Sequence, residues 1–303
     1  DLDLSSVCGK IDGKNVNWTP IKAKNSIFDG AGHTISNLYI CDPIMSYRYG
    51  RKNVSKKSFF DEVLGVENLT IKKAFVKTMA YPAGIAYSCK YLNNCKFDGV
   101  VIGKENAYAL VAISNEIVNC SNYGICISDD ESIAWGSNKV VNCNNRGRLI
   151  SYGTIVGACI FDRNVNISNF YNSGDLFVSL KDEPSLFLSR RTSNDDNYAT
   201  NCYILTSEEG KTDDANLVEY SNIKAFKNGS ITDSLNKYVL ANPKTVINKT
   251  DNVLLNSWIQ GDDGFPRFEN DTLSPTEGYI VHFVGDLRSV FVSVDGTLDL
   301  PVP

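Results

Sequence analysis

The sequence is poor in the residues on which many catalytic and metal sites depend. It has only 2 histidines among 303 residues, His33 and His282. Neither is followed by glutamate, so the H-E-x-x-H motif of zinc proteases is absent. No C-x-x-C pair or histidine cluster offers zinc its usual closely spaced ligands. Serine and cysteine triads also need a histidine with a supporting motif. The sequence therefore predicts no catalytic, cofactor-binding or metal-binding residue.

Basic runs and long apolar segments are also lacking. The formal net charge is -5, and the arginine-rich spots, Arg146 with Arg148 and Arg190 with Arg191, are short. Because nucleic acids are bound by a concentrated basic face, we expect no nucleic-acid partner. No apolar stretch approaches the roughly 20 residues of a transmembrane helix. The chain opens at Asp1 without the pattern of a signal peptide. Either the protein is cytosolic or a leader has been removed, and the start at a residue other than Met favours the second. We therefore expect a secreted or cell-surface protein.

Cysteine is plentiful, but its pattern is not that of a disulfide framework. The 9 cysteines are odd in number and belong to a large chain. Most of them recur inside one sequence repeat, whereas disulfide frameworks are typical of small secreted domains. We therefore expect free thiols.

An asparagine followed by an apolar residue recurs along the chain. These asparagines are Asn37, Asn68, Asn94, Asn119, Asn142, Asn169 and Asn201. The steps between them are 31, 26, 25, 23, 27 and 32 residues. In four copies a glycine follows five residues later, at Gly99, Gly124, Gly147 and Gly174. One fixed internal spacing in four copies indicates a repeat architecture.

Each repeat holds three short apolar segments separated by turn residues, which is typical of strands. Three strands per repeat predict an all-β fold, a right-handed parallel β-helix of the pectate-lyase type, because parallel crossovers are overwhelmingly right-handed. Stacked repeats then form columns of equivalent residues. Cys95, Cys120, Cys143 and Phe170 are expected to share one inward column, with Cys202 after them. Asn122, Asn145 and Asn172 form a second column, and the glycines are expected to mark a turn with positive φ.

The sequence predicts three regions. Residues 1–205 form the repeats, and residues 206–271 form a C-terminal cap with a helix at 230–241. Ser230 and Asp233 resemble an N-cap arrangement for this helix. Because an open stack end exposes unpaired backbone, we expect this helix and residues 253–268 to cover the end. Residues 272–303 read as a linker and a β-hairpin, the start of a further small β module or a hairpin docked on the stack.

The repeats resemble the GLUG-motif repeats of secreted and surface bacterial proteins. The most similar stretch runs from Ala83 to Ile102, AGIAYSCKYLNNCKFDGVVI, and FDGAGHTISNLYI and LNKYV…GFPRF resemble the ends of such arrays. The resemblance covers roughly residues 20–270. This sequence departs from the family in having Ala, Ser or Thr where the family usually repeats glycine. The resemblance implies an adhesin-like protein or a non-catalytic part of a larger protease, and the motif carries no catalytic residues.

Three functions compete at this point. The first is a non-catalytic adhesion or scaffold protein that presents its surface to host glycans or glycoproteins, with further domains in the same polypeptide. The second is a polysaccharide lyase or hydrolase on the same fold. The third is an accessory region of a secreted protease. A calcium-dependent lyase needs an acidic column, but the residues before the column glycines are Asp98, Tyr123, Arg146 and Ser173.

The remaining acidic and histidine candidates are read as structural. Asp129, Asp130 and Glu131 form an acidic loop, with Asp162 and Arg163 one repeat later; a solvated loop is the favoured interpretation, and ion binding stays open. His33 is expected to pack in the turn made by Gly30 and Gly32. Eight N-x-Ser/Thr sequons, Asn68 and Asn119 among them, are attributed to the high asparagine content.

The register also predicts where substitutions matter most. Val118, Val141 and Ile167 are expected on one interior strand of the stack. Val141→Asp should then be strongly destabilising, whereas Asp129→Ala should cost less than about 0.5 kcal/mol.

Overall fold

The computed structural model of the chain is mostly β, with many parallel strands and short helices near its C-terminal end. It describes residues 1–42, 46–48, 51–53, 57–79, 81–129, 131–152, 155–160, 166–178, 187–188, 198–205, 219–283 and 288–293. The strands β7 and β8, Ser46–Arg48 and Arg51–Asn53, form a separate antiparallel pair.

The N-terminal strands are β1 Leu2–Asp3, β2 Gly9–Ile11, β3 Lys14–Val16, β4 Ile21–Asp29, β5 Thr34–Ser36 and β6 Tyr39–Asp42. The repeats contribute β9 Phe60–Glu67, β10 Thr70–Thr78, β11 Ala86–Ser88, β12 Tyr91–Asn93, β13 Lys96–Gly103, β14 Asn106–Val118, β15 Ser121–Asn122, β16 Ile125–Ser128, β17 Glu131–Asn145, β18 Arg148–Ser151, β19 Ile155–Ile160, β20 Asn166–Asn172, β21 Leu176–Val178, β22 Phe187–Leu188, β23 Tyr198–Leu205 and β24 Glu219–Ser221. The C-terminal elements are α1 Ile223–Lys227, α2 Ser230–Ala241, β25 Lys244–Ile247, β26 Asp251–Leu254, β27 Trp258–Gln260, β28 Pro266–Phe268, β29 Gly278–Phe283 and β30 Arg288–Ser293.

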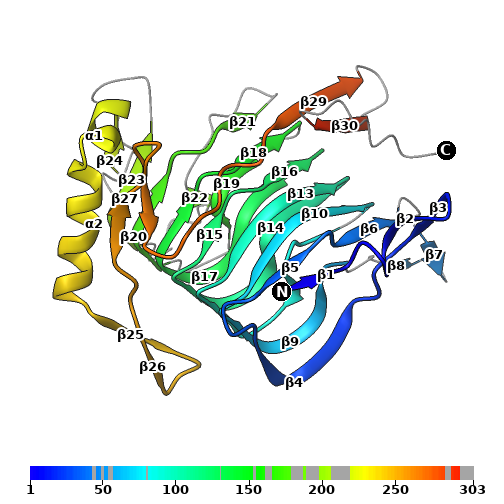
Figure 1. The fold of residues 1–303 in the computed structure, drawn as a ribbon, viewed down its shortest axis with the longest axis horizontal. Helices are drawn as coiled ribbons and strands as arrows, with labels where there is room; N and C mark the ends of the chain where they lie inside the picture. The colour runs from blue at the N-terminus through cyan, green and yellow to red at the C-terminus, as the bar shows by residue number, and fades with distance from the viewer. Residues whose placement is uncertain are drawn as a thin grey trace.

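Each repeat pairs in parallel with the next, position by position. Val101 lies opposite Cys126, Cys126 opposite Leu149, and Leu149 opposite Leu176. The strands therefore run side by side in the same direction, as Figure 1 shows for β10, β13, β16 and β18. This pairing satisfies the backbone of each repeat with that of its neighbours and aligns equivalent side chains in columns.

The interior is built from the side chains that alternate inward along these strands. Ile117, Val140 and Ile167 form one interior column. Cys95, Cys120 and Cys143 occupy another, continued by Phe170 and Cys202, and all five are buried. The thiols of this column are free. Cysteine serves here as a small apolar residue that fits between closely spaced repeats.

The recurring asparagines, rather than the glycines, adopt the left-handed backbone conformation. Asn94, Asn119, Asn142, Asn169 and Asn201 have φ of 53°, 55°, 56°, 53° and 56°. None of the four column glycines has a positive φ, so the expectation that they mark such a turn is wrong. Asparagine is one of the few residues with a side chain that tolerates this conformation, because its short amide bonds locally.

The asparagine amides form a hydrogen-bonded ladder along the stack. Four Nδ2 groups donate to the Oδ1 of the preceding repeat: Asn94 to Asn68 at 2.8 Å, Asn142 to Asn119 at 2.7 Å, Asn169 to Asn142 at 2.6 Å and Asn201 to Asn169 at 2.6 Å. Asn119 Nδ2 instead donates to the carbonyl of Leu254 at 2.8 Å. The ladder begins at Asp29, whose carboxylate accepts from Asn68 at 3.0 Å. The ladder thus supplies the turn conformation and satisfies its own polar groups.

The column glycines are needed because the repeats approach too closely for a side chain. A Cβ on Gly99 would lie 2.5 Å from the carbonyl oxygen of Ala74. A Cβ on Gly124, Gly147 or Gly174 would lie 2.5, 1.9 and 1.8 Å from the carbonyl oxygen of the preceding column glycine. The requirement is therefore steric and not conformational.

A second asparagine column lies inside the stack. Asn122 Nδ2 donates to Asn145 Oδ1 at 2.7 Å, and Asn145 Nδ2 donates to Asn172 Oδ1 at 2.6 Å. The positions before and after this column in register are Phe97 and Ile204. Amides can replace apolar residues here because each one finds partners in an adjacent repeat and in the glycine turn.

The N-terminal residues cover the first repeat. β1 pairs with β5, and Leu4 and Cys8 are buried in the main core. Trp18 donates its indole N–H to the carbonyl of Phe59 at 3.1 Å. His33 is an exposed turn residue whose Nδ1 lies 3.5 Å from a carboxylate oxygen of Asp1. It therefore pairs with the chain start instead of packing in the turn.

The helix α2 begins and ends at the expected residues, but its N-terminus is built differently. The N-cap is Gly229, with φ of 87°, and Ser230 is the first helical residue. Asn228 Oδ1 accepts from both the backbone N–H and the hydroxyl of Ser230. The predicted Ser230–Asp233 capping arrangement is therefore wrong, because the chain enters the helix through a left-handed glycine.

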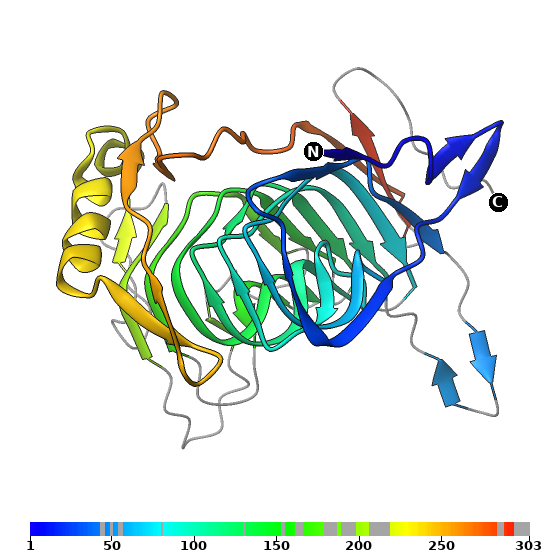
Figure 2. The same ribbon diagram turned by 60° about the horizontal axis from the view of Figure 1, so that its bottom comes forward.

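The C-terminal segment lies along the side of the stack. Residues 244–276 contact Asn94 and Asn119 at one point and Arg146 and Tyr171 at another, which belong to different repeats. Figure 2 shows this orange segment extending across the stack away from α1 and α2. The predicted position over the open end is thus not where these contacts lie. Residues 206–218 fall outside the described residues.

The last two described strands, β29 and β30, form a hairpin, as the sequence predicts. β29 and β30 pair in antiparallel fashion. The preceding stretch is not a free linker, because the backbone N–H of Thr276 donates to the carbonyl of Tyr123 at 2.8 Å. Its hydroxyl also donates to Asp98. The start of the hairpin is therefore fixed against the stack.

The structure corrects the predicted position of Val141. Val141 pairs with Val118 and Ser168, whereas Ile167 pairs with Val140. Val118 and Val141 point away from the main core into a second cluster with Tyr171, beneath the C-terminal segment. A further member of this cluster is Trp258. The sequence-based alignment of Ile167 with Val118 and Val141 is therefore wrong by one residue, and a shift of one residue turns a side chain to the other face of the sheet.

Val141→Asp is still expected to destabilise the protein. Val141 is 4% exposed, so the carboxylate would be buried without a partner or would force the segment above it to detach. Because detachment gives the charge access to water, we expect a loss of about 2 to 3 kcal/mol in the free energy of unfolding, measured by denaturant titration. Leu254→Asp, at a residue 65% exposed on that segment, is the control. Equal losses in the two variants would contradict the assigned orientation.

Candidate functional site

Most residues singled out from the sequence are not brought together in space. The ring of His33 lies beside the carboxylate of Asp1 and makes no contact with the buried cysteine column. Asp129 is half-buried, whereas Asp130, Asp162, Arg163, Arg190 and Arg191 lie outside the described residues, as do the side chains of Glu131 and His282. The open question of ion binding at the acidic loop therefore also lies outside them. Among the described residues no three His, Cys, Asp or Glu side chains form a metal ligand set.

The densest group of polar and aromatic side chains lies where the stack meets the C-terminal segment. Asp98, Tyr123 and Arg146 occupy equivalent outward positions in successive repeats, each one residue before a column glycine. The C-terminal segment supplies the opposing residues Asp263 and Asp271. We name Asp98, Tyr123, Arg146 and these two aspartates the corner cluster.

Tyr123 and Asp271 are joined inside this cluster. The tyrosine hydroxyl donates to Asp271 Oδ2 at 2.7 Å, and Lys96 Nζ lies 3.5 Å from Asp271 Oδ1. The side chain of Asp271 is fully buried, and the backbone N–H of Leu273 also donates to it. Burial and the neighbouring carboxylate raise the pKa of Tyr123 well above its usual value. The tyrosine therefore remains a hydrogen-bond donor and holds the segment in place.

Arg146 is held between two aromatic rings. Its guanidinium carbon lies 5.4 Å from the ring centre of Tyr123 and 5.2 Å from that of Phe265. It also donates to Asp263 in an ion pair. Burial acts to raise the pKa of Asp263, but the hydrogen bonds from Arg146 and from the backbone of Phe265, together with the charges of Arg146 and Arg267, outweigh it, so the pKa is lowered. Stacking and pairing together hold this 6% exposed arginine at the interface.

Asp98 is the least favourable carboxylate in the cluster. Burial raises its pKa, and the hydroxyl of Thr276 and the nearby Lys72 and Lys73 oppose this only in part. The folded state thus holds the proton to a higher pH than the unfolded chain does. The contribution of this residue to stability is therefore greatest at low pH and is lost as pH rises from the ordinary carboxyl range through the raised pKa.

Asp98→Asn is expected to stabilise the protein at pH 7. The amide oxygen can still accept from Thr276, but no charge has to be buried. Free energies of unfolding should be measured for both proteins between pH 3 and pH 7. The difference should shrink as pH falls to about 4, where the unfolded carboxyl also becomes protonated. A variant less stable than the wild type at pH 7 would contradict the assigned cost of this charge.

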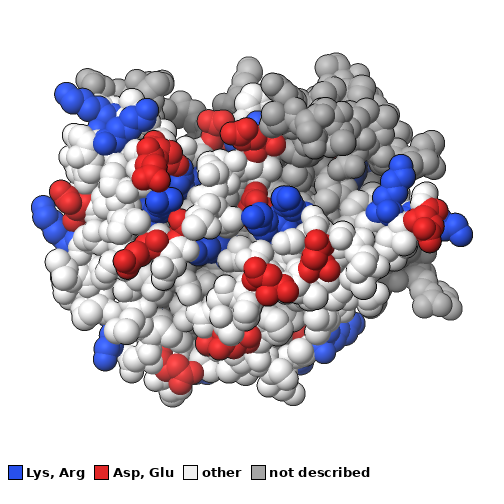
Figure 3. All heavy atoms as spheres, viewed as in Figure 1, with Lys and Arg blue, Asp and Glu red and all other residues white. Residues whose placement is uncertain are grey.

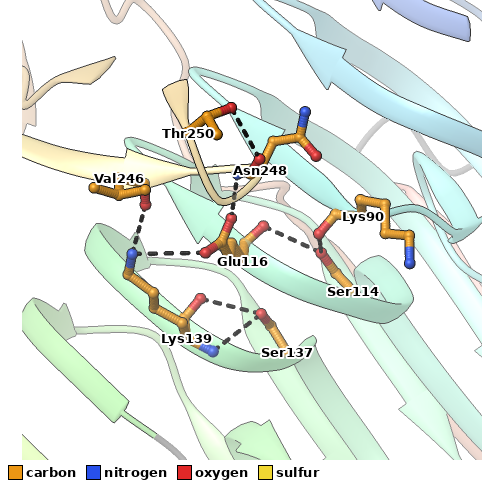
Figure 4. A network of polar contacts seen from close by, with 8 residues as sticks. All are labelled: Lys90, Ser114, Glu116, Ser137, Lys139, Val246, Asn248 and Thr250. Carbon is orange, nitrogen blue, oxygen red and sulfur yellow. Dashed lines mark hydrogen bonds and ion pairs between the residues drawn. The ribbon is translucent and has the colours of Figure 1, made fainter. Parts of the chain in front are cut away.

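A second polar network fixes the β25–β26 hairpin. Glu116 accepts from the backbone N–H of Asn248 at 2.6 Å, and Lys139 donates to the carbonyl of Val246 at 2.6 Å. The two side chains lie 3.7 Å apart and come from neighbouring repeats. Figure 4 shows both reaching the hairpin, with the hydroxyls of Ser114 and Ser137 bonded to backbone oxygens of their own strands, β14 and β17. The hydroxyls and the lysine are thus committed to structural contacts.

The asparagine ladder itself takes part in holding the segment. Asn256 stands between Asn94 and Asn119, because its Nδ2 donates to Asn94 Oδ1 at 3.1 Å and its backbone N–H to Asn119 Oδ1 at 3.0 Å. Trp258 donates its indole N–H to Asn142 Oδ1 at 2.7 Å. The ladder is therefore both an internal brace and the binding surface for residues 254–258.

The buried thiols are poor nucleophiles. Burial raises the pKa of Cys89 to about 12 and raises that of Cys95 and Cys120 well above the usual value. The reactive thiolate is therefore scarce near neutral pH.

Alkylation of native protein at pH 8 should leave Cys95, Cys120 and Cys143 unlabelled, because their side chains have no access to solvent. The same reagent should label all three after denaturation, as read by peptide mass spectrometry. Rapid labelling in the native protein, or disulfide linkage of these three residues, would contradict this prediction.

The sequence did not predict the corner cluster, the Glu116–Lys139 network at the β25–β26 hairpin or the contacts between the asparagine ladder and residues 254–258. The sequence marks Asp98, Tyr123 and Arg146 only as positions that do not form an acidic column, and Arg146 also as part of a short basic spot. The residues that meet them lie more than 100 positions later and carry no repeat signal. On the face seen in Figure 3, acidic and basic side chains are interspersed among the described residues. No described helix is long and apolar enough to cross a membrane.

Comparison of the chain with models of known protein families, with curated proteins and with solved structures gave no match.

Proposed function

We propose that this chain is a right-handed parallel β-helix of the GLUG-repeat type that acts outside the cell as a non-catalytic adhesion or scaffold protein. Its partners would be host glycans or glycoproteins, and further domains of the same polypeptide would continue the assembly. Parallel pairing of successive repeats, glycines at close approach and the asparagine ladder support this architecture.

The observation that carries the proposal is the commitment of the polar outward residues to structure. Arg146, Tyr123 and Asp98 each bond to the C-terminal segment. Glu116 and Lys139 bond to the β25–β26 hairpin of the same segment. The segment and the stack thus form one braced body. A rigid extended surface loses little conformational entropy on binding a polymer, which favours a presenting role.

The test is a binding screen with a turnover assay beside it. The protein is applied to arrays of host-type glycans and to mucin-type glycoproteins, and saturable binding is expected. The same protein is incubated with uronic-acid polymers and neutral polysaccharides, with and without calcium. Release of unsaturated sugars or reducing ends would overturn the non-catalytic proposal and favour a carbohydrate-active enzyme. Absence of binding to every glycan and glycoprotein would overturn the adhesion proposal.

A further inference from the structure

The junction between α1 and α2 holds the one asparagine–glycine pair of the sequence, Asn228–Gly229. Figures 1 and 2 both show these two helices at the outer edge of the molecule. Asn228 is exposed, and the nearest atom that a Cβ on Gly229 would meet outside the adjoining residues is Gln260 Oε1, at 3.9 Å. The pair is therefore accessible to water and is not crowded by neighbouring side chains.

An asparagine followed by glycine is the pair most prone to lose its side-chain amide. The backbone nitrogen of the glycine attacks the asparagine Cγ, so an N–Cγ bond forms. The Cγ–Nδ2 bond breaks, and the displaced amide leaves as ammonia with the proton of the glycine N–H. Water then opens the cyclic imide on either side, which gives aspartate or isoaspartate. Glycine favours the first step because it has no side chain to hinder the nitrogen and its backbone turns freely.

The backbone of the junction holds the reacting atoms apart. Asn228 has φ of -86° and ψ of 0°. With ψ near 0°, the nitrogen of Gly229 is eclipsed with the backbone nitrogen of Asn228 and is turned away from Cβ, and therefore from Cγ. The N–H of Gly229 also donates to the carbonyl of Phe226 at 3.3 Å. Closure of the imide ring thus requires a rotation at Asn228 that breaks this hydrogen bond.

The side chain of Asn228 is held as well. Its Oδ1 accepts from the backbone N–H of Ser230 at 3.0 Å and from the hydroxyl of Ser230 at 2.7 Å. Gly229 is the N-cap of α2 and has no side chain to bond there, so the amide of Asn228 takes that role. The amide has to leave Ser230, the first residue of α2, before Cγ meets the nitrogen of Gly229.

The C-terminal segment braces the same junction. Gln260 Nε2 donates to the carbonyl of Phe226 at 2.9 Å, and the hydroxyl of Thr232 donates to Gln260 Oε1. The backbone N–H of Asp233 donates to the carbonyl of Gly229 at 2.9 Å. Opening of the junction therefore breaks a small set of hydrogen bonds at the molecular surface, which makes it a local event that does not require global unfolding.

We propose that Asn228 is a deamidation site whose reaction is gated by opening of the α1–α2 junction. The closed junction preserves the amide, and each opening brings Cγ within reach of the nitrogen of Gly229. Aspartate at this position keeps both hydrogen bonds from Ser230, because a carboxylate oxygen accepts them at least as well and lies near the N-terminus of α2. Isoaspartate adds a methylene group to the backbone and displaces Ser230 from its acceptor. The site thus converts a transient opening into a permanent change at the first turn of α2.

The test follows conversion of Asn228 over time at pH 8 by peptide mass spectrometry, which separates amide, aspartate and isoaspartate. The full chain is compared folded and in guanidinium chloride. Asn222, which is followed by Ile223, is the internal control in the same region. Ser230→Ala removes the hydroxyl bond, and Ser230→Thr keeps it. Thermal unfolding of both variants, and of Asn228→Asp, separates a local opening from a general loss of stability.

In the denatured chain we expect Asn228 to convert at least about tenfold faster than Asn222, because isoleucine hinders attack. The folded wild type should convert at least about tenfold more slowly than the denatured chain. Ser230→Ala should convert about threefold faster than the folded wild type, whereas Ser230→Thr should match it. Asn228→Asp should unfold at the same temperature as the wild type or higher.

The isolated isoaspartate form should also exchange the backbone amide hydrogens at the start of α2 faster than the unmodified protein. Equal rates in the folded and denatured chains would show that the junction is not a gate. A denatured chain in which Asn228 stays an amide would remove the site itself. Wild-type rates in Ser230→Ala, or no conversion in either folded protein, would overturn the role assigned to Ser230. A less stable Asn228→Asp protein would contradict the fit of aspartate at the junction.

Discussion

Gly147→Ala is expected to lower the free energy of unfolding by at least about 3 kcal/mol. The new methyl carbon would lie 1.9 Å from the carbonyl oxygen of Gly124 and 2.7 Å from Asn122 Nδ2. Both neighbours belong to the adjacent repeat, and backbone atoms cannot move aside without breaking parallel pairs. Relief therefore requires the repeats to separate at Ile125 and Arg148, which face one another in register. Denaturant unfolding followed by far-UV circular dichroism measures the loss.

The matched control is Gly13→Ala. A Cβ at Gly13 meets no atom within 4 Å, but its φ of 76° strains any side chain. We expect a loss of about 1 kcal/mol there, from backbone conformation alone. The comparison separates the steric requirement of the glycine column from the conformational one. Equal losses at the two positions would show that close approach of the repeats is not what excludes alanine at Gly147.

Asn142→Ala is expected to cost about 3 to 5 kcal/mol. Its Nδ2 donates to Asn119 and to the carbonyl of Asn256, and its Oδ1 accepts from Asn169 and from the Trp258 indole. Alanine removes all four bonds and leaves buried groups without partners, each worth about 1 to 3 kcal/mol. It must also adopt a φ of 56°, which costs a residue with a Cβ about 1 to 2 kcal/mol.

Two companion variants divide this loss. Asn142→Gly restores the left-handed conformation but not the amide, so it should recover only about 1 kcal/mol. Asn248→Ala also has a φ of 50°, but its amide makes only a 3.4 Å contact with Asp251 at the surface. It should cost little beyond the backbone strain. If Asn142→Gly is as stable as the wild type, the ladder hydrogen bonds contribute nothing and the asparagines serve only the turn.

Local spacing in the sequence determined the parallel repeat pattern in advance. The strands recur with the asparagine–glycine unit because stacked repeats must keep equivalent residues in equivalent environments. The inward cysteine column and the helix at Ser230–Ala241 could be read from short-range alternation and periodicity. Such features depend on neighbours within one repeat or one turn of helix.

The same local pattern left two assignments open to error. Asparagine and glycine both occur in left-handed turns, so five-residue spacing alone could not say which of them has the positive φ. Val141 and Ile167 differ by one residue in their distance from the ladder asparagine, and one residue reverses the facing of a side chain. Both were decided by register between strands, which depends on how repeats of unequal length align.

Only the tertiary structure decided where the C-terminal segment lies and what it fastens. Asn256, Asp263 and Asp271 meet residues from 117 to 162 positions earlier. Nothing in the sequence near these residues marks their partners, because an ion pair or a single amide bond leaves no periodic signal. A long segment that must bury Trp258 and Phe268 can satisfy its local needs at the end or at the side of a stack. The side prevailed because it offers both an apolar strip at Val118 and Val141 and the unfilled position in the ladder between Asn94 and Asn119.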